Sequence, residues 1–506
     1  MRSRVEALII GGGATGTGIA RDLAMRGTEV MLVEAGDFAA GATGANHGML
    51  HSGARYAVTD PVSARECAEE GAVLKRIARF CIEDTGGLFV SASRDDAEYV
   101  DRFLPACGRA GIRAEEIDTR EAREIEPCLD AGIKAAVKVP DASIDPFFLA
   151  LGNVSSARRH GATVLNHSPV RRIRRIDGGF EAVIGRGGRE RRVAADVVIN
   201  AAGAWAGEVA AMLGVSIPLC IDKGTLVVFN GRLVNRLVNR LRPPSDGDIL
   251  VPHRTATILG TTSSAGAAGD RATSAEVERL IAEAEAVLPG IKEARAVRAY
   301  AGARPLLGGG SAGRGASRTF QVIDHACDGV DGLISVAGGK LTTFRLMAER
   351  TSDAVMEKLG RAARCRTADE EIEPFDDAPS SDFDLEAMRY RHGTSAAALS
   401  PFSTAPGCGC EAVTRGEMEH YASSPDVSDI GDLMRRTRAG MGYCQAGLCA
   451  VNMASAMDQG ARELQRYYGE RWRGVEPVLF GEQLRQEMFK AHLLKAYGID
   501  HTEEGR

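Results

Sequence analysis

Three glycines near the start of the chain have the spacing of a dinucleotide-binding turn. Gly11, Gly13 and Gly16 form a GxGxxG pattern directly after the apolar run VEALII. In such a turn the first glycine permits a tight reversal, the second lets the backbone approach a pyrophosphate, and the third lets helix and strand pack closely. Glu34, at the end of the next apolar run, is placed to accept hydrogen bonds from a ribose diol. The pattern predicts an FAD or NAD site and does not distinguish the two.

A second group of polar residues lies in the glycine-rich stretch GATGANHGMLHSGARY (41–56). Its small residues suit a backbone wrapped closely around a ligand. His51, Arg55 and Tyr56 add a base, a planar cation and a hydroxyl, and a guanidinium suits phosphate or carboxylate. A surface loop with solvated side chains is the alternative.

Three further residues downstream are candidates for the same site. Arg304 lies in GARPLL and Lys340 in AGGKLTTFR, at what reads as a strand-to-helix turn. A cation there would stabilise negative charge on a reduced flavin or a substrate, although a lysine at a helix start can also be a simple surface charge. His253 follows the run ILVP and could act as a base, but a structural histidine is the commoner case.

Four cysteines near the C-terminus form a CxC pair, Cys408 and Cys410, and a CxxxxC pair, Cys444 and Cys449. Zinc sites usually use CxxC knuckles or Cys/His pairs, and neither spacing is present. Four thiolates in a compact segment can instead hold an iron–sulfur cluster. The spacing alone leaves zinc and unligated thiols open. Nearby arginines could form a solvated face, offset the charge of a cluster or meet an acidic partner: Arg435, Arg436 and Arg438.

These residues require an α/β framework. The stretch 5–33 reads as strand, turn, helix and strand, and two more buried-strand patterns, 196–200 and 333–337, run into small-residue turns. Two intervening stretches, about 85–165 and 215–320, predict a mixed second lobe inserted between returns to the first.

The end of the chain differs in composition from the rest. Residues 367–384 carry many acids with proline and serine, and we therefore predict a solvated linker over 361–384. Residues 385–460 predict a compact cysteine-containing domain, and 461–506 an amphipathic tail.

Composition excludes several classes of protein. The 506 residues carry 62 Lys and Arg against 68 Asp and Glu, a net charge of −6, without a long basic block. Nucleic-acid binding is therefore a poor hypothesis. No 18-residue apolar span appears, and Glu6 with the glycines 11–13 interrupts the faint signal-peptide pattern of the N-terminus. We expect a cytoplasmic chain whose 11 cysteines are mostly reduced.

Ordered blocks across residues 5 to about 360 resemble the FAD-dependent glycerol-3-phosphate dehydrogenases. They include IIGGGATGTGIARDLAMRG, GATGANHGMLHSGARYAVTD, VINAAGAWAG, AGARPL and GGKLTTFRLMAE. Within that family the sequence is most similar to the catalytic flavoprotein subunit of the anaerobic bacterial enzymes. The resemblance implies FAD in place of NAD, and a Rossmann-type FAD-binding domain of the glycine-oxidase-like (DAO) class over residues 1–360, with an inserted α+β substrate cap.

The resemblance also implies the site residues. By this resemblance, the catalytic candidates Arg55, Tyr56, Arg304 and Lys340 lie where the family surrounds substrate and flavin, and His51 lies in the adjoining loop. His253 is a further catalytic candidate from its position in the sequence alone. The FAD-binding candidates come from the ends of the predicted strands and from the glycine-rich stretch: Gly11, Gly13, Ala14, Thr15, Gly16, Glu34, Thr43, Asn46, Ala202, Gly203, Gly338, Gly339, Leu341 and Thr342.

The cysteine segment, CGCEAVTRGEM followed by DLMRRTRAGMGYCQAGLC, resembles the bacterioferritin-associated ferredoxin-like [2Fe-2S] domain. This resemblance implies that Cys408, Cys410, Cys444 and Cys449 ligate the cluster.

We therefore expect oxidation of sn-glycerol 3-phosphate to dihydroxyacetone phosphate, with His51 favoured over His253 as the base. Electrons would leave through the [2Fe-2S] centre. The family implies two partners, one a second flavoprotein subunit, the other a membrane-associated iron–sulfur subunit. They would feed the quinone pool and hold the chain at the inner face of the membrane. The alternatives are a flavin dehydrogenase of a 2-hydroxy acid or amino acid, and a non-catalytic FAD/iron–sulfur scaffold.

Overall fold

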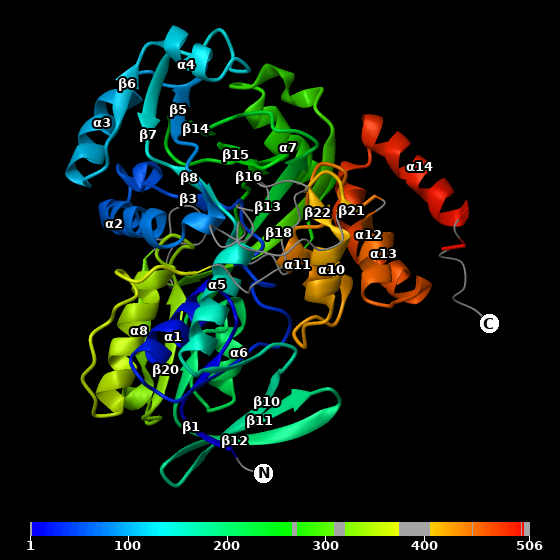
Figure 1. Ribbon diagram of the computed structural model, residues 1–506. Coiled ribbons are helices and arrows are strands. Elements are labelled where there is room, and N and C mark those ends of the chain that lie inside the picture. Colours follow the sequence, from blue (N-terminus) through cyan, green and yellow to red (C-terminus); the bar gives the residue numbers. More distant parts are fainter. Residues whose placement is uncertain are drawn as a thin grey trace.

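The computed structural model describes residues 3–265, 271–307, 319–373, 405–447, 449–496 and 498–499. Three lobes are visible in Figure 1: the dinucleotide lobe at the bottom, the cap above it, and the C-terminal helices at the right. The described residues contain no helix that is both long and apolar enough to cross a membrane.

The dinucleotide lobe is built on a sheet whose centre is parallel. Strand β1 (Ser3–Ile10) pairs in parallel with β12 (Arg189–Asn200) on one side and β2 (Val30–Val33) on the other. Strands β9 (Thr163–Leu165) and β20 (Leu333–Gly338) extend it in parallel, next to β2 and β12. Antiparallel strands complete its edges: β10 (Val170–Ile176), β11 (Gly179–Arg186) and β19 (Phe320–Asp324). The carboxyl ends of the parallel strands therefore meet at one edge, where such sheets bind ligands.

The helices that pack on this sheet include α1 (Ala14–Met25), α5 (Pro146–Arg159), α6 (Ala206–Ala211) and α8 (Phe344–Lys358). Helix α1 packs against both α5 and α8. The first predicted cap segment, about 85–165, is therefore too long, because α5 and β9 belong to the dinucleotide lobe. The sequence pattern could not show this, since a cap helix and a helix on the sheet bury similar apolar faces.

The cap is a second, mostly antiparallel sheet of nine strands within the described residues. Its long central strands are β13 (Leu219–Phe229) and β18 (Ala296–Leu307), which pair in antiparallel register. The other strands are β5 (Gly87–Ser91), β6 (Glu115–Ile117), β7 (Ala135–Val139), β14 (Leu237–Arg240), β15 (Ile249–His253), β16 (Ala256–Gly260) and β17 (Ser264–Ala265). Helix α7 (Ser274–Ala284) packs on this sheet. A smaller sheet, β3 (Met49–Leu50), β8 (Ala142–Ile144) and β4 (Ile82–Glu83), lies at the junction of the lobes.

The C-terminal lobe, which we define as residues 405–499, consists of a short hairpin and five helices in its described part. The elements are β21 (Pro406–Cys408), β22 (Val413–Thr414), α10 (Arg415–Ala422), α11 (Ile430–Thr437), α12 (Cys449–Ala456), α13 (Ala461–Val475) and α14 (Gly481–Ala496). Helix α14 forms the outer edge of the molecule (Figure 1).

The predicted solvated linker is wrong over 361–373, because this segment packs on the dinucleotide lobe. Ile372 is fully buried, and its N–H donates to the carbonyl of Ile77 at 2.7 Å. The buried guanidinium of Arg21 donates to the carbonyls of Glu370 (2.8 Å) and Thr367 (3.4 Å). The remainder of the predicted linker, 374–384, lies outside the described residues, as do 385–404.

Replacing Ile372 tests this packing. We expect Ile372→Ala to destabilise the protein by about 2–5 kcal/mol, the usual cost of removing a buried Ile side chain. This loss of stability would appear as a lower urea concentration at the midpoint of unfolding than in the unaltered protein. Glu371→Ala, next to it and exposed, is the control; equal midpoints for the two variants would mean that the segment is not docked.

Candidate active site

A cavity of about 1140 Å³ lies where the carboxyl ends of the parallel strands face the cap. Its walls come from the turns after β1, β2, β12 and β20, from the glycine-rich stretch, and from β18 of the cap. The cavity is large enough for a cofactor and a small substrate together.

The glycine turn after β1 has the close contacts that its sequence predicts. Gly11 has a φ of +114°, and a Cβ there would overlap the carbonyl oxygen of Ala201. A Cβ at Gly16 would overlap the carbonyl oxygen of Gly11, so Gly16 serves packing and does not line the cavity. The residues at the start of α1, Gly13, Ala14 and Thr15, line the cavity, and the N-terminus of a helix favours an anion.

Hydrogen bonds fix the adjoining loops. The carboxylate of Glu34 accepts from the N–H groups of Gly12 (2.6 Å) and Gly36 (2.8 Å), which holds it at the cavity wall. The Thr43 hydroxyl accepts from the N–H of Ala14 at 3.0 Å. Asn46 donates to the Thr43 carbonyl at 2.6 Å. Thr43 and Asn46 thus line the cavity and also shape the loop that surrounds it.

Arg55 is the cation whose geometry most clearly points to a ligand. Its Nη2 donates to Asp248 at 2.9 Å and to the carbonyl of Ser245 at 3.2 Å. Its Nη1 is buried and has no hydrogen-bond partner among the described residues, and the side chain lines the cavity. An unpaired buried donor is costly, so this atom is suited to an anionic ligand.

Arg304 and Lys340 approach the cavity from opposite lobes. Arg304 of β18 donates to Asp222 at 2.6 Å and to Thr261 at 2.5 Å. Lys340 follows β20, and its Nζ lies 5.1 Å from the ring centroid of Tyr56. All four of the predicted residues Arg55, Tyr56, Arg304 and Lys340 line the same cavity.

Two histidines of the glycine-rich stretch face each other at the cavity. The rings of His47 and His51 are 5.8 Å apart, edge to face, and Nδ1 of each is buried without a hydrogen-bond partner among the described residues. Burial, with the charges of Arg304 and Arg55, lowers the pKa of His47 to about 3. Burial also holds the pKa of His51 well below its ordinary value. Both rings are therefore neutral and able to accept a proton.

His253 does not line the cavity. His253 is the last residue of β15 and is buried. Its Nε2 lies 2.8 Å from the carbonyl oxygen of His47. Burial and the nearby Arg438 lower its pKa. His253 thus supports the loop that carries His47, which argues against its predicted role as a base.

Most of the predicted cofactor residues also line the cavity: Gly11, Gly13, Ala14, Thr15, Glu34, Thr43, Asn46, Ala202, Gly203, Gly338, Gly339 and Leu341. Thr342 does not, and its hydroxyl instead accepts from the N–H of His51 at 3.0 Å. Sequence reasoning missed His47 and Trp205, which line the cavity, and Asp248 and Asp222, which hold the arginines. Of these four residues, only His47 could have been predicted from the sequence, because it lies between the predicted residues Asn46 and His51 in the glycine-rich stretch.

The four cysteines of the C-terminal lobe meet at one place. Sγ of Cys410 lies 3.7 Å from that of Cys408 and 3.6 Å from that of Cys444. Hydrogen bonds with the thiols of Cys410 and Cys449 lower the pKa of both Cys408 and Cys444. All four line a second cavity of about 400 Å³, next to α14.

Arginines of α11 join this lobe to the dinucleotide lobe. Both oxygens of the buried Asp37 accept from Arg436, at 2.8 and 2.9 Å, and one also accepts from Arg435 at 2.6 Å. Although burial opposes it, these arginines hold the pKa of Asp37 well below its usual range.

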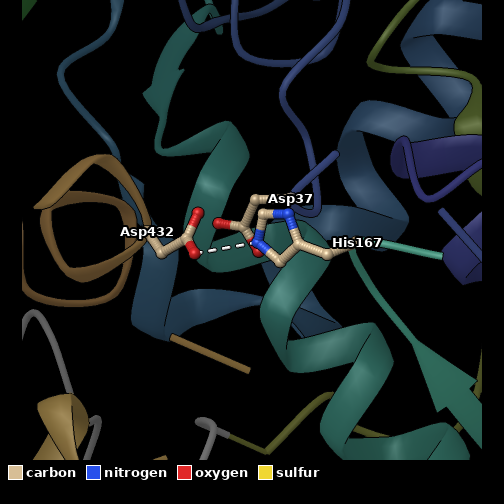
Figure 2. Close-up of side chains that lie close together, drawn as sticks. All are labelled: Asp37, His167 and Asp432. Carbon is tan, nitrogen blue, oxygen red and sulfur yellow. Dashed lines mark hydrogen bonds and ion pairs between the residues drawn. The ribbon is translucent and has the colours of Figure 1, made fainter. Parts of the chain in front are cut away.

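Figure 2 shows Asp37 beside His167 and Asp432, a grouping that could suggest a metal site. However, His167 donates to Asp432 at 2.8 Å, and Asp432 also accepts from Arg435 at 2.8 Å. Because arginines occupy these carboxylates, the group is an ion-paired contact between lobes. Arg435 and Arg436 therefore do not form a solvated face. They pair with acidic residues of this same chain.

Comparison with known proteins agrees with this geometry. The family model "FAD dependent oxidoreductase" (DAO) matches residues 6–353. The A subunit of the anaerobic glycerol-3-phosphate dehydrogenase of Escherichia coli K12 is 43% identical, over 96% of this chain and 95% of its own. The chain belongs to the FAD-dependent oxidoreductase family, in the branch of the anaerobic glycerol-3-phosphate dehydrogenase A subunits.

Two solved structures share the fold of this FAD-dependent oxidoreductase. The glycerol-3-phosphate dehydrogenase of Bacillus halodurans, complexed with FAD, has a TM-score of 0.65 and 20% identity over 99% of this chain and 97% of its own. Glycine oxidase from Geobacillus kaustophilus has a TM-score of 0.61 and 22% identity over 73% of this chain and 98% of its own. The predicted family and DAO-type fold are confirmed.

The cavity of this oxidoreductase fits FAD. The glycines at 11 and 13 let the backbone approach a pyrophosphate, Glu34 follows β2 at the cavity wall and can bind a ribose, and Lys340 also lines the cavity. FAD is the cofactor of the family, so the ambiguity between FAD and NAD is resolved.

Gly11→Ala should abolish FAD retention by this oxidoreductase, because the added Cβ meets the Ala201 carbonyl. Gly27→Ala is a matched control, since Gly27 also has a positive φ, +78°, but a Cβ there meets nothing within 4 Å. The ratio of flavin to protein absorbance after gel filtration measures the effect. Equal flavin content in the two variants would contradict the proposed approach of backbone to cofactor.

Proposed function

We propose that the chain oxidises sn-glycerol 3-phosphate to dihydroxyacetone phosphate in this cavity. The single observation that carries the proposal is the buried, unpartnered Nη1 of Arg55 at the cavity wall, in a chain 43% identical to a glycerol-3-phosphate dehydrogenase subunit. FAD, when bound, supplies the acceptor for the hydride that leaves the secondary alcohol carbon.

Substrate recognition in this proposal depends on the cations. Arg55 has a free donor for a phosphate oxygen, while Asp248 fixes its other nitrogen. Arg304, which also lines the cavity, is oriented by Asp222 and Thr261. A guanidinium held in this way loses little side-chain entropy when it binds an anion.

The chemical step also needs a base for the hydroxyl proton. We assign His51, as the sequence suggests, because its neutral ring lines the cavity with an unpartnered Nδ1. His47 has the same properties and is the direct competitor. The low pKa values keep both rings neutral before the substrate binds. A bound phosphate would offset the nearby arginines and raise these pKa values, which would strengthen either ring as a base.

The first prediction from this proposal concerns substrate binding. Under anaerobic conditions, glycerol 3-phosphate should bleach the flavin, while 2-hydroxy acids and amino acids should not. Arg55→Lys should raise the apparent Kd for glycerol 3-phosphate by roughly 30-fold, or about 2 kcal/mol, because a charged hydrogen bond is lost.

Arg242→Lys is the matched control for Arg55→Lys, because Arg242 also pairs with Asp248 (2.9 Å between Nε and Oδ1) but does not line the cavity. Absence of bleaching by glycerol 3-phosphate in the unaltered protein would reject the proposal. Bleaching by a 2-hydroxy acid or an amino acid instead would favour a flavin dehydrogenase of that substrate. Absence of bleaching by all of these compounds would favour a non-catalytic FAD/iron–sulfur scaffold.

The second prediction concerns the base. His51→Gln should slow flavin reduction by about 10²–10⁴-fold, the usual contribution of a general base, with little change in substrate Kd. Stopped-flow flavin absorbance measures both quantities. His47→Gln should be affected much less; a larger loss in His47→Gln than in His51→Gln would transfer the assignment to His47.

We further propose that the four cysteines hold a [2Fe-2S] cluster and that electrons leave through it. Four sulfurs of adjacent CxC and CxxxxC pairs suit this cluster. Reduced FAD would hold two electrons and a [2Fe-2S] cluster would accept one at a time, so a partner must take each electron from the cluster in turn. Of the two proposed partners, one is a second flavoprotein subunit, the other a membrane-associated iron–sulfur subunit, and together they deliver the electrons to quinone.

The surface of the C-terminal lobe supports a partner. Several of its large apolar side chains are exposed, and aromatic residues and Met are typical of interface cores. They are Tyr443, Trp472, Phe480, Leu484, Met488 and Phe489. We propose that the chain is cytoplasmic and meets the inner face of the membrane through such partners.

A further inference from the structure

A chain of buried polar contacts joins the cysteine site to the cavity. It begins at Glu411, which follows Cys410 in the sequence and is 3% exposed. Its Oε2 accepts from Nε of Arg438 at 2.8 Å. Its Oε1 accepts from the Thr255 hydroxyl of the cap at 3.3 Å. Glu411, next to Cys410, is thus held by Arg438 on one carboxylate oxygen and by Thr255 on the other.

The first branch runs through Arg438 into the dinucleotide lobe. Besides Glu411, its guanidinium donates to Asp145, which is fully buried. Asp145 caps α5, accepting from the N–H groups of Phe147 and Phe148 at 3.0 Å each. The preceding residue, Ile144, donates its N–H to the carbonyl of Gly48 at 2.8 Å.

The second branch runs through the turn between β15 and β16. Thr255 lies two residues after His253, whose Nε2 contacts the carbonyl of His47 at 2.8 Å. The two branches therefore meet at His47 and Gly48, and His47 lines the cavity. This arrangement explains why His253 is buried away from the substrate.

The backbone of Arg438 shows that its position is specific. Its φ is +64°, in the left-handed region, where a residue with a Cβ is uncommon. Such conformations persist only where the surroundings enforce them, and they concentrate at functional sites. Here the conformation turns the chain after α11 so that the guanidinium reaches both carboxylates.

We propose that Arg438 is a positioning residue for electron transfer. It holds the Cys408–Cys410 loop at a fixed place beside the His47–Gly48 segment, and so sets the separation of flavin and cluster. This inference rests on the proposed function: the reduced FAD loses one electron to the oxidised [2Fe-2S] cluster, and a second after the cluster has passed the first to an external acceptor. Arg438 takes no part in oxidising the alcohol.

Arg435 provides a matched control, because it is also an arginine of this segment at the lobe boundary. Its partner Asp37 keeps two hydrogen bonds from Arg436 when Arg435 is replaced. Arg435→Gln should therefore leave the docking of the lobes in place, while Arg438→Gln removes the bridge between Glu411 and Asp145.

The experiment follows single turnovers of the full chain, loaded with FAD and cluster, after mixing with glycerol 3-phosphate. Flavin bleaching reports alcohol oxidation, and the cluster absorbance reports the first transferred electron. In Arg438→Gln we expect unchanged bleaching and slowing of the second phase by about 10-fold or more. Arg438→Lys should recover part of the rate, and Arg435→Gln should match the unaltered protein.

Amide hydrogen exchange gives a second readout that does not depend on the cluster. In the FAD-loaded protein, Arg438→Gln should lose protection at residues 47–48, and Arg435→Gln should not. If Arg438→Gln cannot be purified folded, Thr255→Val removes the other contact to Glu411, with the same expected directions.

A normal rate of electron transfer from flavin to cluster in Arg438→Gln would overturn the inference. The same result in Thr255→Val would overturn it if that variant has to replace Arg438→Gln. Slowing in Arg435→Gln equal to that in Arg438→Gln would overturn it as well. Unchanged exchange at residues 47–48 would also overturn it. Absence of bleaching by glycerol 3-phosphate is a different result, which rejects the proposed function itself.

Discussion

Two buried carboxylates of the dinucleotide lobe, Asp37 and Asp145, are paired with arginines of the C-terminal lobe. A buried ion pair adds little net stability, because desolvation offsets its attraction, but a displaced partner leaves a costly unpaired charge. Such pairs therefore specify one arrangement of the lobes. The position of the four cysteines relative to the FAD cavity follows from this constraint.

The cavity itself uses charge in a related way. Asp248 and Asp222 orient Arg55 and Arg304 without using all of the donors of Arg55, so a fixed cation is presented to an anionic substrate. Burial, together with the same cations, lowers the pKa of His47 and so keeps its ring neutral. Binding of the substrate phosphate and availability of a base are thus linked through the same arginines.

The sequence predicted those features that are local. The glycine turn and Glu34 were found because their spacing reflects one strand, one turn and one helix start, and the cysteine pairs were found for a similar reason. The partners of Arg55, Arg304 and Arg438 could not be found, since Asp248, Asp222 and Asp145 reach them only through sheet register and lobe packing. The sequence could not decide between the two roles considered for His253, because burial at the end of β15 looks the same in sequence whether or not the side chain faces a cavity. The docked segment 361–373 was missed because Ile372 is a single apolar anchor among acidic neighbours.

In the proposed function, electrons from glycerol 3-phosphate pass through FAD to a centre held by the four cysteines. This electron path can be tested by electron paramagnetic resonance of the anaerobically purified chain, before and after addition of glycerol 3-phosphate. We expect the substrate to bleach the flavin and to produce the signal of a reduced [2Fe-2S] cluster, and we expect this signal to be absent when Cys444 is replaced by Ser. Flavin bleaching without any signal from iron, in a protein that contains zinc or no metal, would contradict it.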